Sequence, residues 1–477
     1  MNFNKKLAVA VSGAVLLMAG QFALADSTTD IVDALVSKGV LTEEEGKLIS
    51  KGHVSKKNAE GTVAFKDGFK INSGDGNSSI ALIGRIQLDS RSYIGNGGGT
   101  ANKNLADTFD VRRAYLGAKG TFKKYYDFEI TADFAGLTNA DTVSSSSTSL
   151  DVAYLNVNYF DKKAMFQFGQ FKMPYSLDER TSSRFIDFQE RSFVNNTSLT
   201  PGKERGIMIH GTPFTGINYA LAFSNGQGKN TNDVDNSADG KDIILHADTN
   251  LAEILGNKEA VAHFGASFAN GSVTPAAAGK QRTEGRGNEF FSATAPTGTT
   301  MERTRYNFET ALAYGPVKLQ GEYGNVNFEG TSGANTYDKD IDAFYVSALW
   351  MLTGEKYADN FKGGKFDRIT PKNEFKPDFS SLGAWEVSAR YSEFDASDIK
   401  TVANGATSGT MILAADSATT AFTNKADAYT LGLKWVPQAN ARFLVNYVHT
   451  DYDTPVTLFS KTVTKEKALM FRAQYDF

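Results

Sequence analysis

The segment from Lys172 to Arg205 holds the side chains of this sequence best suited to bind a small ion. Its cations are Lys172, Arg180, Arg184, Arg191, Lys203 and Arg205, and its acids are Asp178, Glu179, Asp187, Glu190 and Glu204. Arginine and lysine in a pore can replace part of the water around an anion. The acids can equally neutralise these cations in ion pairs. Two interpretations therefore stay open, an anion filter and a salt-bridged loop.

The same segment has the features of a loop that packs on a wall. Pro174 ends the extended stretch before it, because proline has no backbone N–H to donate. Four aromatic side chains follow, namely Tyr175, Phe185, Phe188 and Phe193. They can pack on surrounding structure while the charged side chains face a channel. We predict that residues 174–203 constrict a pore, which requires other elements to supply its wall.

The last eleven residues, Lys467 to Phe477, indicate what this wall is. In an extended strand Leu469, Phe471 and Tyr475 lie on one face, and Arg472 and Asp476 lie on the other. One face is apolar and the other is mostly polar. This alternation is typical of a strand in an outer-membrane β-barrel, with lipid outside and water inside.

The two-residue period recurs in sixteen segments. Their bounds are residues 79–89, 108–122, 125–136, 150–160, 164–173, 204–213, 215–225, 241–250, 259–270, 304–314, 316–328, 341–352, 383–394, 425–437, 441–452 and 465–477. Each is about as long as a tilted strand that crosses a bilayer. The expected fold class is all-β, a sixteen-stranded antiparallel transmembrane β-barrel with a short N-terminal helical periplasmic segment. A barrel of this size leaves a water-filled lumen.

The connections between these segments alternate in length, as expected for short periplasmic turns and long outer loops. Residues 353–382 are too long for a simple turn. Residues 63–71 could add an odd strand, and we interpret them as an extension packed near the closing strand. Residues 271–303 contain an arginine cluster, which we expect in a solvated outer loop that contacts lipopolysaccharide phosphates. A second arm of the constriction is the alternative.

The N-terminus predicts export from the cytoplasm. Lys5 and Lys6 precede a short apolar run, and residues 23–25 (ALA) form a small-x-small cleavage pattern. We therefore predict three parts: a signal peptide in residues 1–25, a periplasmic helical or flexible segment in 26–60, and the barrel in 61–477. Thr42 to Glu45 has the form of a helix capping box. A helical pair that self-associates is an alternative to a mobile tail.

Composition and spacing argue against several other classes of protein. The formal net charge of −4 gives no reason to expect nucleic acid as a partner. Cysteine is absent, which excludes disulfides and thiolate metal sites. The five histidines are scattered without metal-ligand spacing, and no Ser-His-acid grouping follows from spacing. We expect no cofactor and no catalysis, so an outer-membrane hydrolase is the weaker alternative.

Several short motifs resemble one porin family. They are residues 112–117 (RRAYLG), 169–174 (GQFKMP), 181–185 (TSSRF), 190–192 (ERS), 350–355 (WMLTGE), 383–386 (GAWE) and 431–435 (LGLKW). Together they resemble the phosphate- and polyphosphate-selective porins (porin O and P type) from about residue 68 onward. The resemblance implies a trimeric sixteen-stranded barrel whose third loop narrows the channel. It assigns the anion-binding role to Arg112, Arg113, Ser182 and Ser183.

Two positions qualify this resemblance. Glu179 stands where the phosphate-specific members carry a constriction lysine, and a carboxylate there would disfavour a divalent anion unless Arg180 compensates. Replacing Glu179 by lysine should then increase anion preference. Arg112 and Arg113 are adjacent, so only one can face the lumen of a regular strand unless a bulge intervenes. Arg113 shares a face with Lys119 and is the preferred lumen residue.

The sequence thus predicts a water-filled channel in the Gram-negative outer membrane. Small hydrophilic solutes would diffuse through it passively, with anions such as phosphate preferred. A general or organic-solute porin for sugars or carboxylates is the alternative. The expected partners are these solutes, outer-membrane lipid and lipopolysaccharide, and two further copies in a homotrimer. The predicted pore-lining residues are Arg112, Arg113, Lys119, Lys172, Glu179, Arg180, Ser182, Ser183, Arg184 and Arg191.

Overall fold

The structure divides the chain into two compact units, Met1–Ala64 with Lys70–Ser79, and Phe65–Phe69 with Ile80–Phe477. It is a computed structural model that describes residues 32, 35–38, 40–49, 61–64, 68–94, 105–135, 148–195, 199–226, 228–230, 240–273, 279–296, 301–400, 410–413, 420–458 and 461–477. The predicted signal peptide lies outside these ranges. We describe each unit by itself.

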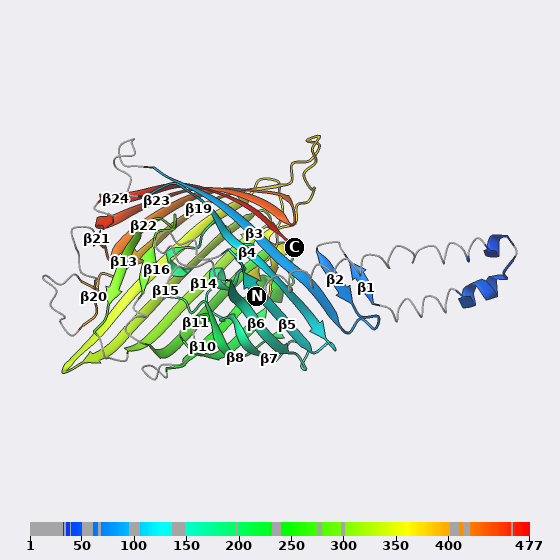
Figure 1. The fold of residues 1–477 in the computed structure, drawn as a ribbon, viewed down its shortest axis with the longest axis horizontal. Coiled ribbons are helices and arrows are strands. Elements are labelled where there is room, and N and C mark those ends of the chain that lie inside the picture. Colours follow the sequence, from blue (N-terminus) through cyan, green and yellow to red (C-terminus); the bar gives the residue numbers. More distant parts are fainter. Residues whose placement is uncertain are drawn as a thin grey trace, which may run out of the picture. The chain divides into compact units, whose positions relative to one another are not determined.

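The larger unit is a closed antiparallel barrel of sixteen strands (Figure 1). The strands are β3 (Ser79–Tyr93), β4 (Thr108–Phe122), β5 (Tyr126–Asp133), β6 (Ser149–Val157), β7 (Met165–Lys172), β8 (Lys203–Phe214), β9 (Ile217–Ser224), β10 (Asp242–Asn250), β11 (Ala260–Val273), β14 (Met301–Tyr314), β15 (Val317–Ser332), β16 (Asn335–Met351), β19 (Ala384–Asp395), β22 (Lys425–Gln438), β23 (Ala441–Leu458) and β24 (Lys461–Asp476). The last strand, β24, pairs with the first, β3. The predicted fold class and all sixteen predicted strands are confirmed.

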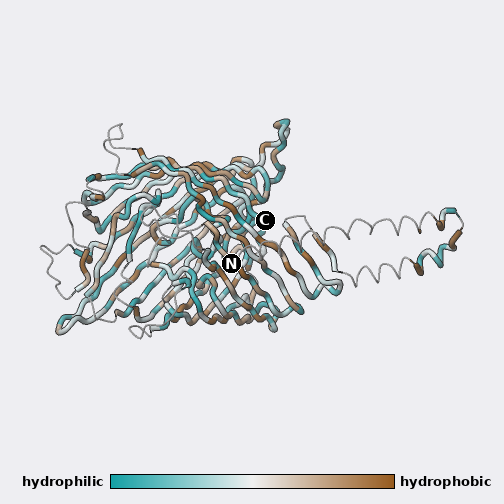
Figure 2. Tube along the Cα trace, viewed as in Figure 1, coloured by the Kyte–Doolittle hydropathy of each residue, from teal (hydrophilic) through white to brown (hydrophobic). Residues whose placement is uncertain are grey.

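The side chains of β24 alternate between the two surfaces of the wall as predicted. Leu469, Phe471 and Tyr475 are 43–53% exposed on the outer surface, whereas Arg472 and Asp476 are almost fully buried on the inner one. Figure 2 shows the same alternation of apolar and polar residues along the other strands. Lipid outside and polar contacts inside account for it.

The strands extend beyond their predicted bounds at several ends. β15 and β16 continue to Ser332 and Asn335 and are joined there by a tight turn at Gly333, whose φ is +61°. The sequence predicts a longer connection at this place. Glycine adopts a positive φ without strain, which permits so short a hairpin.

The described parts of residues 271–303 form strands with a buried aromatic pair, so the prediction of a solvated loop is wrong for them. Two short strands form there, β12 (Lys280–Arg282) and β13 (Glu289–Thr294), and β13 also pairs with β20 (Ile412–Leu413). Phe290 and Phe291 are buried against Phe193 and Phe394, because two adjacent aromatic side chains are poorly accommodated in water. The segment therefore packs against the loop predicted to constrict the pore, as the alternative interpretation required.

The long segment between β16 and β19 also folds inward. It contains a 3-10 helix, η4 (Tyr357–Asn360), and a small hairpin of β17 (Phe361–Lys362) and β18 (Lys365–Phe366). Tyr357, Phe361 and Phe366 form a buried apolar cluster with Leu177 and the wall residue Leu349. The aromatic side chains hold this segment inside the barrel.

The remaining short elements lie in or beside the loops. They are α4 (Leu177–Arg180), η2 (Phe193–Asn195), α5 (Leu251–Ile254) and β21 (Thr420–Ala421), which pairs with β23. Among the residues that the structure describes, no helix is both long and apolar enough to cross a membrane.

The smaller unit contains a short helix at residues 43–49 and a hairpin of β1 (Thr62–Ala64) and β2 (Phe69–Asn72). The predicted capping box is confirmed: the backbone N–H of Thr42 donates to Glu45 Oε2 over 2.9 Å, and the backbone N–H of Glu45 donates to Thr42 Oγ1 over 3.2 Å. In the hairpin, Val63 lies opposite Ile71.

Candidate functional site

The described part of the connection between β7 and β8, residues 173–195 and 199–202, folds into the barrel, and we call it the inner loop. Its short helix α4 is capped by Ser176, whose side chain accepts from the backbone N–H of Glu179 over 3.2 Å. Ser176 Oγ also donates to Asn195 Oδ1 over 2.7 Å, which joins the start of the loop to η2. Tyr175, Phe188 and Phe193 are buried as predicted, whereas Phe185 is half-buried.

Polar contacts attach the inner loop to the wall at several strands. The backbone N–H groups of Leu177 and Asp178 donate to the carboxylate of Glu322 on β15 over 3.2 and 2.7 Å. Lys318, also on β15, forms an ion pair of 2.7 Å with Asp187. Because each of these groups is buried or half-buried, its loss would leave an unsatisfied polar partner. The loop is therefore a fixed part of the interior.

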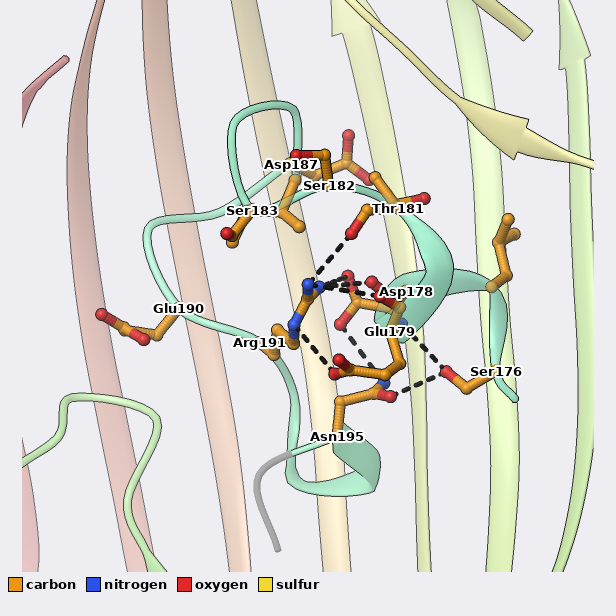
Figure 3. A network of polar contacts seen from close by, with 12 residues as sticks. Ser176, Asp178, Glu179, Thr181, Ser182, Ser183, Asp187, Glu190, Arg191 and Asn195 are labelled. Atoms are coloured by element: carbon orange, nitrogen blue, oxygen red, sulfur yellow. Dashed lines mark hydrogen bonds and ion pairs between the residues drawn. The ribbon is translucent and has the colours of Figure 1, made fainter. Parts of the chain in front are cut away.

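Arg191 organises the centre of the inner loop (Figure 3). Its guanidinium contacts the Asp178 carboxylate at 3.3 Å and the Glu179 carboxylate at 3.2 Å, and it donates to the carbonyl oxygen of Thr181 over 2.9 Å. Lys172 lies 3.6 Å from Glu179 on the other side. Glu179 is thus neutralised by two cations.

The pKa of Glu179 reflects these contacts. Burial acts to raise it, but Arg191 and Lys172 outweigh burial, so the pKa is lowered. The carboxylate stays ionised and holds the two cations together. For these four predicted residues, Lys172, Glu179, Arg180 and Arg191, the geometry is that of a salt-bridged loop, because Arg180 in turn pairs with Asp248 and Glu309.

Arg112 and Arg113 both contact groups of the barrel interior. Arg112 forms a two-point ion pair with Glu190, with distances of 2.9 and 3.2 Å, and Arg113 donates to Gln87 Oε1 over 2.8 Å. In β4 the exposed side chains stand at odd positions near the start, Phe109 and Val111, but at an even position further on, Leu116. This irregularity in β4 lets two adjacent side chains face inward.

A second group of arginines contacts neutral groups of the inner loop and the wall. Among the described residues, no carboxylate lies within ion-pair distance of Arg85, Arg113 or Arg442. Arg85 donates to Ser183 Oγ over 2.8 Å, and Arg442 donates to the carbonyl oxygens of Ser183 and Ile186 over 3.3 Å each. Arg85 and Arg442 thus both contact Ser183, one of the two predicted serines.

Arg85 and Arg442 were not predicted as site residues. Both occupy inward positions of their strands, and Arg85 belongs to the polar face of the first predicted strand. That face could have identified Arg85 as a lumen residue. Its proximity to Ser183 could not be foreseen, because the two residues are 98 positions apart.

A cavity of about 620 Å³ opens between the inner loop, the inward segment after β16 and the wall. Its charged lining residues are the cations Arg85, Lys119, Lys172, Arg180, Arg184, Lys203 and Lys365, and the acids Glu129, Asp151, Asp248 and Asp367. The serines Ser182 and Ser183 also line it. Seven cations and four acids give this lining a positive formal charge.

A family model described as phosphate-selective porin O and P matches residues 80–477. The chain belongs to this family. Porin O of Pseudomonas aeruginosa PAO1 is 26% identical over 426 residues, which cover 84% of this chain and 90% of that protein. The family resemblance that the sequence motifs predicted is confirmed. The protein is therefore an outer-membrane porin, a channel and not an enzyme.

Two solved structures are similar to this porin. The anion-selective porin from Comamonas acidovorans is 13% identical with a TM-score of 0.49, covering 84% of this chain and 100% of that one. The channel DcaP of Acinetobacter baumannii is 14% identical with a TM-score of 0.49, covering 86% and 100% respectively.

Glu190 is the shared acidic partner of four arginines. Beside Arg112, it contacts Arg472 at 2.9 Å, Arg91 at 3.6 Å and Arg286 at 3.9 Å. In Figure 3 its side chain points away from the Arg191 network. Burial acts to raise the pKa of Glu190, but Arg112, Arg286 and Arg472 together hold it well below the usual range.

Replacing Glu179 by glutamine is expected to destabilise the porin by about 1–3 kcal/mol without reversing its ion preference. Arg191 loses one ionic partner but keeps Asp178 and the carbonyl of Thr181. Thermal unfolding in detergent and the reversal potential in a salt gradient check the two parts. A matched replacement of Glu393, whose ion pair with Lys425 is far more exposed, should have a smaller effect on stability.

The replacement of Glu179 by lysine has a different expected outcome in this geometry. The new ammonium would lie beside Arg191 and Lys172 within a buried site, so disruption of the inner loop should precede any gain in anion preference. A stable lysine variant with increased anion preference would contradict this geometry.

Proposed function

We propose that this porin conducts anions by passive diffusion, phosphate among them, and that the inner loop forms the constriction of the pathway. The observation that carries the proposal is that Arg85 and Arg442 contact Ser183 and have no acidic partner among the described residues. Within that part of the chain, no carboxylate competes with a dissolved anion for their donors. The excess of cations over acids in the cavity lining supports the same conclusion.

Phosphate suits this arrangement chemically. Guanidinium groups donate charge-assisted hydrogen bonds to phosphate oxygens, and these bonds are stronger than those between neutral groups. Serine hydroxyls can donate to the remaining oxygens. The donors of Arg85 and Arg113 now bond neutral acceptors, Ser183 Oγ and Gln87 Oε1, which an anion can replace. Exchange of one acceptor for another lets the ion enter and leave.

The acid at position 179 does not oppose this proposal. Its side chain is about 12% exposed and contacts Arg191 and Lys172, and it is not among the residues that line the cavity. The negative charge is therefore compensated within the loop. It has little effect on the potential at the serines, because neighbouring opposite charges cancel its field at a distance.

The test is a pair of measurements on purified porin in planar bilayers. In a potassium chloride gradient the reversal potential should have the sign of an anion-preferring channel. Added phosphate should then reduce the single-channel chloride current at concentrations well below that of chloride. A cation-preferring reversal potential would overturn the proposal. Anion preference without competition by phosphate would assign the general or organic-solute function instead.

Four further assignments belong to this proposal. Residues 1–25 act as a cleaved signal peptide, residues 26–60 lie in the periplasm, three barrels assemble into a homotrimer, and the outer loops contact lipopolysaccharide. The resemblance of the chain to its family supports the trimer, and the small-x-small pattern supports cleavage. N-terminal sequencing of the membrane form and chemical cross-linking test the first and third assignments.

A further inference from the structure

Three neighbouring strands bring four metal-ligating side chains together on the inner wall, where Arg180 also contacts two of them. His246 and Asp248 are on β10, His263 is on β11, and Glu309 is on β14. Asp248 lies opposite Gly265, which in turn lies opposite Glu309. A Cβ atom at Gly265 would lie 2.5 Å from Glu309 Oε1, so glycine keeps open the space between the two carboxylates.

The distances within this group fit a bound metal ion. His246 Nε2 lies 2.9 Å from Asp248 Oδ2 and 3.8 Å from Glu309 Oε1, and one ligand atom from each of the three residues lies within 4.8 Å of the others. Ligand atoms about 2.0–2.1 Å from a tetrahedral ion are roughly 3.4 Å apart. Small side-chain movements would suffice to reach this geometry.

Two buried atoms of the group lack hydrogen-bond partners among the described residues. They are His263 Nδ1 and Glu309 Oε2. His263 is fully buried, and its Nε2 lies 2.9 Å from Glu309 Oε1. With the proton on Nε2, where it is donated to Glu309, Nδ1 keeps a lone pair 3.8 Å from Asp248 Oδ1. Buried acceptors without donors are costly, and a cation bound at Glu309 would satisfy the free oxygen of its carboxylate.

Arg180 now supplies the positive charge of the group. Its guanidinium contacts Asp248 Oδ2 at 3.2 Å and Glu309 Oε1 at 2.5 Å. One guanidinium facing two carboxylates leaves a net negative charge. Arg180 comes from α4 of the inner loop, whereas the other groups come from the wall. His246 and Asp248 also line the cavity, which gives an ion a path from the lumen.

We propose that His246, Asp248 and Glu309 bind a divalent transition-metal ion, represented by Zn²⁺, in competition with Arg180. Imidazole nitrogen with carboxylate oxygen suits Zn²⁺, whereas Mg²⁺ prefers oxygen ligands alone. His263 orients Glu309 through its Nε2 contact, as groups behind metal ligands do. The ion and the guanidinium require the same two carboxylates, so binding displaces Arg180 and with it α4.

The test is equilibrium dialysis of metal-free porin in detergent against Zn²⁺, with Mg²⁺ as the comparison ion. One Zn²⁺ per chain and no stoichiometric Mg²⁺ are expected. His246→Ala should weaken Zn²⁺ binding by about 100-fold or more. Loss of a residue behind the ligands already weakens binding by up to about 100-fold, and loss of a ligand should have at least this effect. Arg180→Ala should tighten binding. The measurement involves no current, so it is independent of the solute that the channel conducts.

His449→Ala is the matched control, because His449 and Asp451 form the same i, i+2 pair on a strand, with 3.0 Å between Nε2 and Oδ2. It should leave Zn²⁺ binding unchanged. Glu309→Gln preserves the shape of the ligand and serves as a second variant, and circular dichroism confirms that each protein is folded. The proposal is overturned if wild-type porin binds no Zn²⁺, if binding survives both His246→Ala and Glu309→Gln, or if His449→Ala removes it equally. Weaker Zn²⁺ binding by the Arg180→Ala variant would overturn the proposed competition between Zn²⁺ and the Arg180 guanidinium.

Discussion

Replacing Glu190 by glutamine is expected to lower the free energy of unfolding of the porin by about 3–5 kcal/mol. Glu190 is the shared partner of Arg112 and Arg472, at 2.9 Å each, and it also contacts Arg91 and Arg286. Arg472 is fully buried. Without the carboxylate, several cations would face one another in a site with little water, with Asp89 and Asp110 as the nearest remaining acids.

The effect should depend on pH in a defined direction. The pKa of Glu190 is well below its unfolded value, so its stabilising contribution is fully present above the unfolded pKa of about 4.3. That contribution disappears as the pH falls through the lowered folded-state pKa. The difference between wild type and Glu190→Gln should therefore be constant from pH 7 to pH 5 and shrink only under more acidic conditions.

Urea or thermal unfolding in detergent, followed by circular dichroism, measures this difference. Glu393→Gln is the control, because the side chains of Lys425 and Glu393 are 37% and 25% exposed, against 11% for Glu190. More exposed ion pairs contribute less, about 0–1 kcal/mol at the surface. Equal losses for the two variants would show that the cluster around Glu190 is not a buried centre of stability.

Replacing Arg85 and Arg442 together by glutamine is expected to weaken the block of chloride current by phosphate about 100-fold or more. Hydrogen bonds to charged groups contribute about 1.5–3 kcal/mol each, and both arginines lack a carboxylate partner among the described residues. The reversal potential should move toward that of a non-selective channel. This expectation rests on the proposed anion function.

Two companion variants separate charge from structure. Arg442 also holds the inner loop through the carbonyl oxygens of Ser183 and Ile186, so its loss could widen the pore as well. Arg442→Lys keeps the charge and should retain most of the anion preference, while Lys425→Gln on the outer surface should change neither property. If phosphate blocks the chloride current of the double variant as strongly as that of wild type, these arginines do not form the anion site.

The predictions that succeeded rest on short-range patterns. A strand at the boundary of lipid and water must alternate apolar and polar residues, and β24 shows this with Phe471 outward and Arg472 inward. The same rule located all sixteen strands. The capping box at Thr42 is equally local, because its two partners are three residues apart.

The prediction that failed concerns packing between distant segments. Residues 271–303 appear polar in the sequence, yet Phe290 and Phe291 pack on Phe193 and Phe394 from two other parts of the chain. The sequence also left two interpretations open for Glu179, and its contact with Arg191 depends on how the loop folds. Neither outcome has a signature within a window of a few residues.

The sequence by itself determined the barrel, its strand number and its family, because alternation along each strand follows from the solvents on its two faces. Only the tertiary structure decided which charges are neutralised and which remain available to an ion. Arg85 and Ser183, or Asp248 and Glu309, meet through strand register and loop folding. Coulomb interactions and hydrogen bonds act over a few ångströms in space, whatever the separation of the residues along the chain.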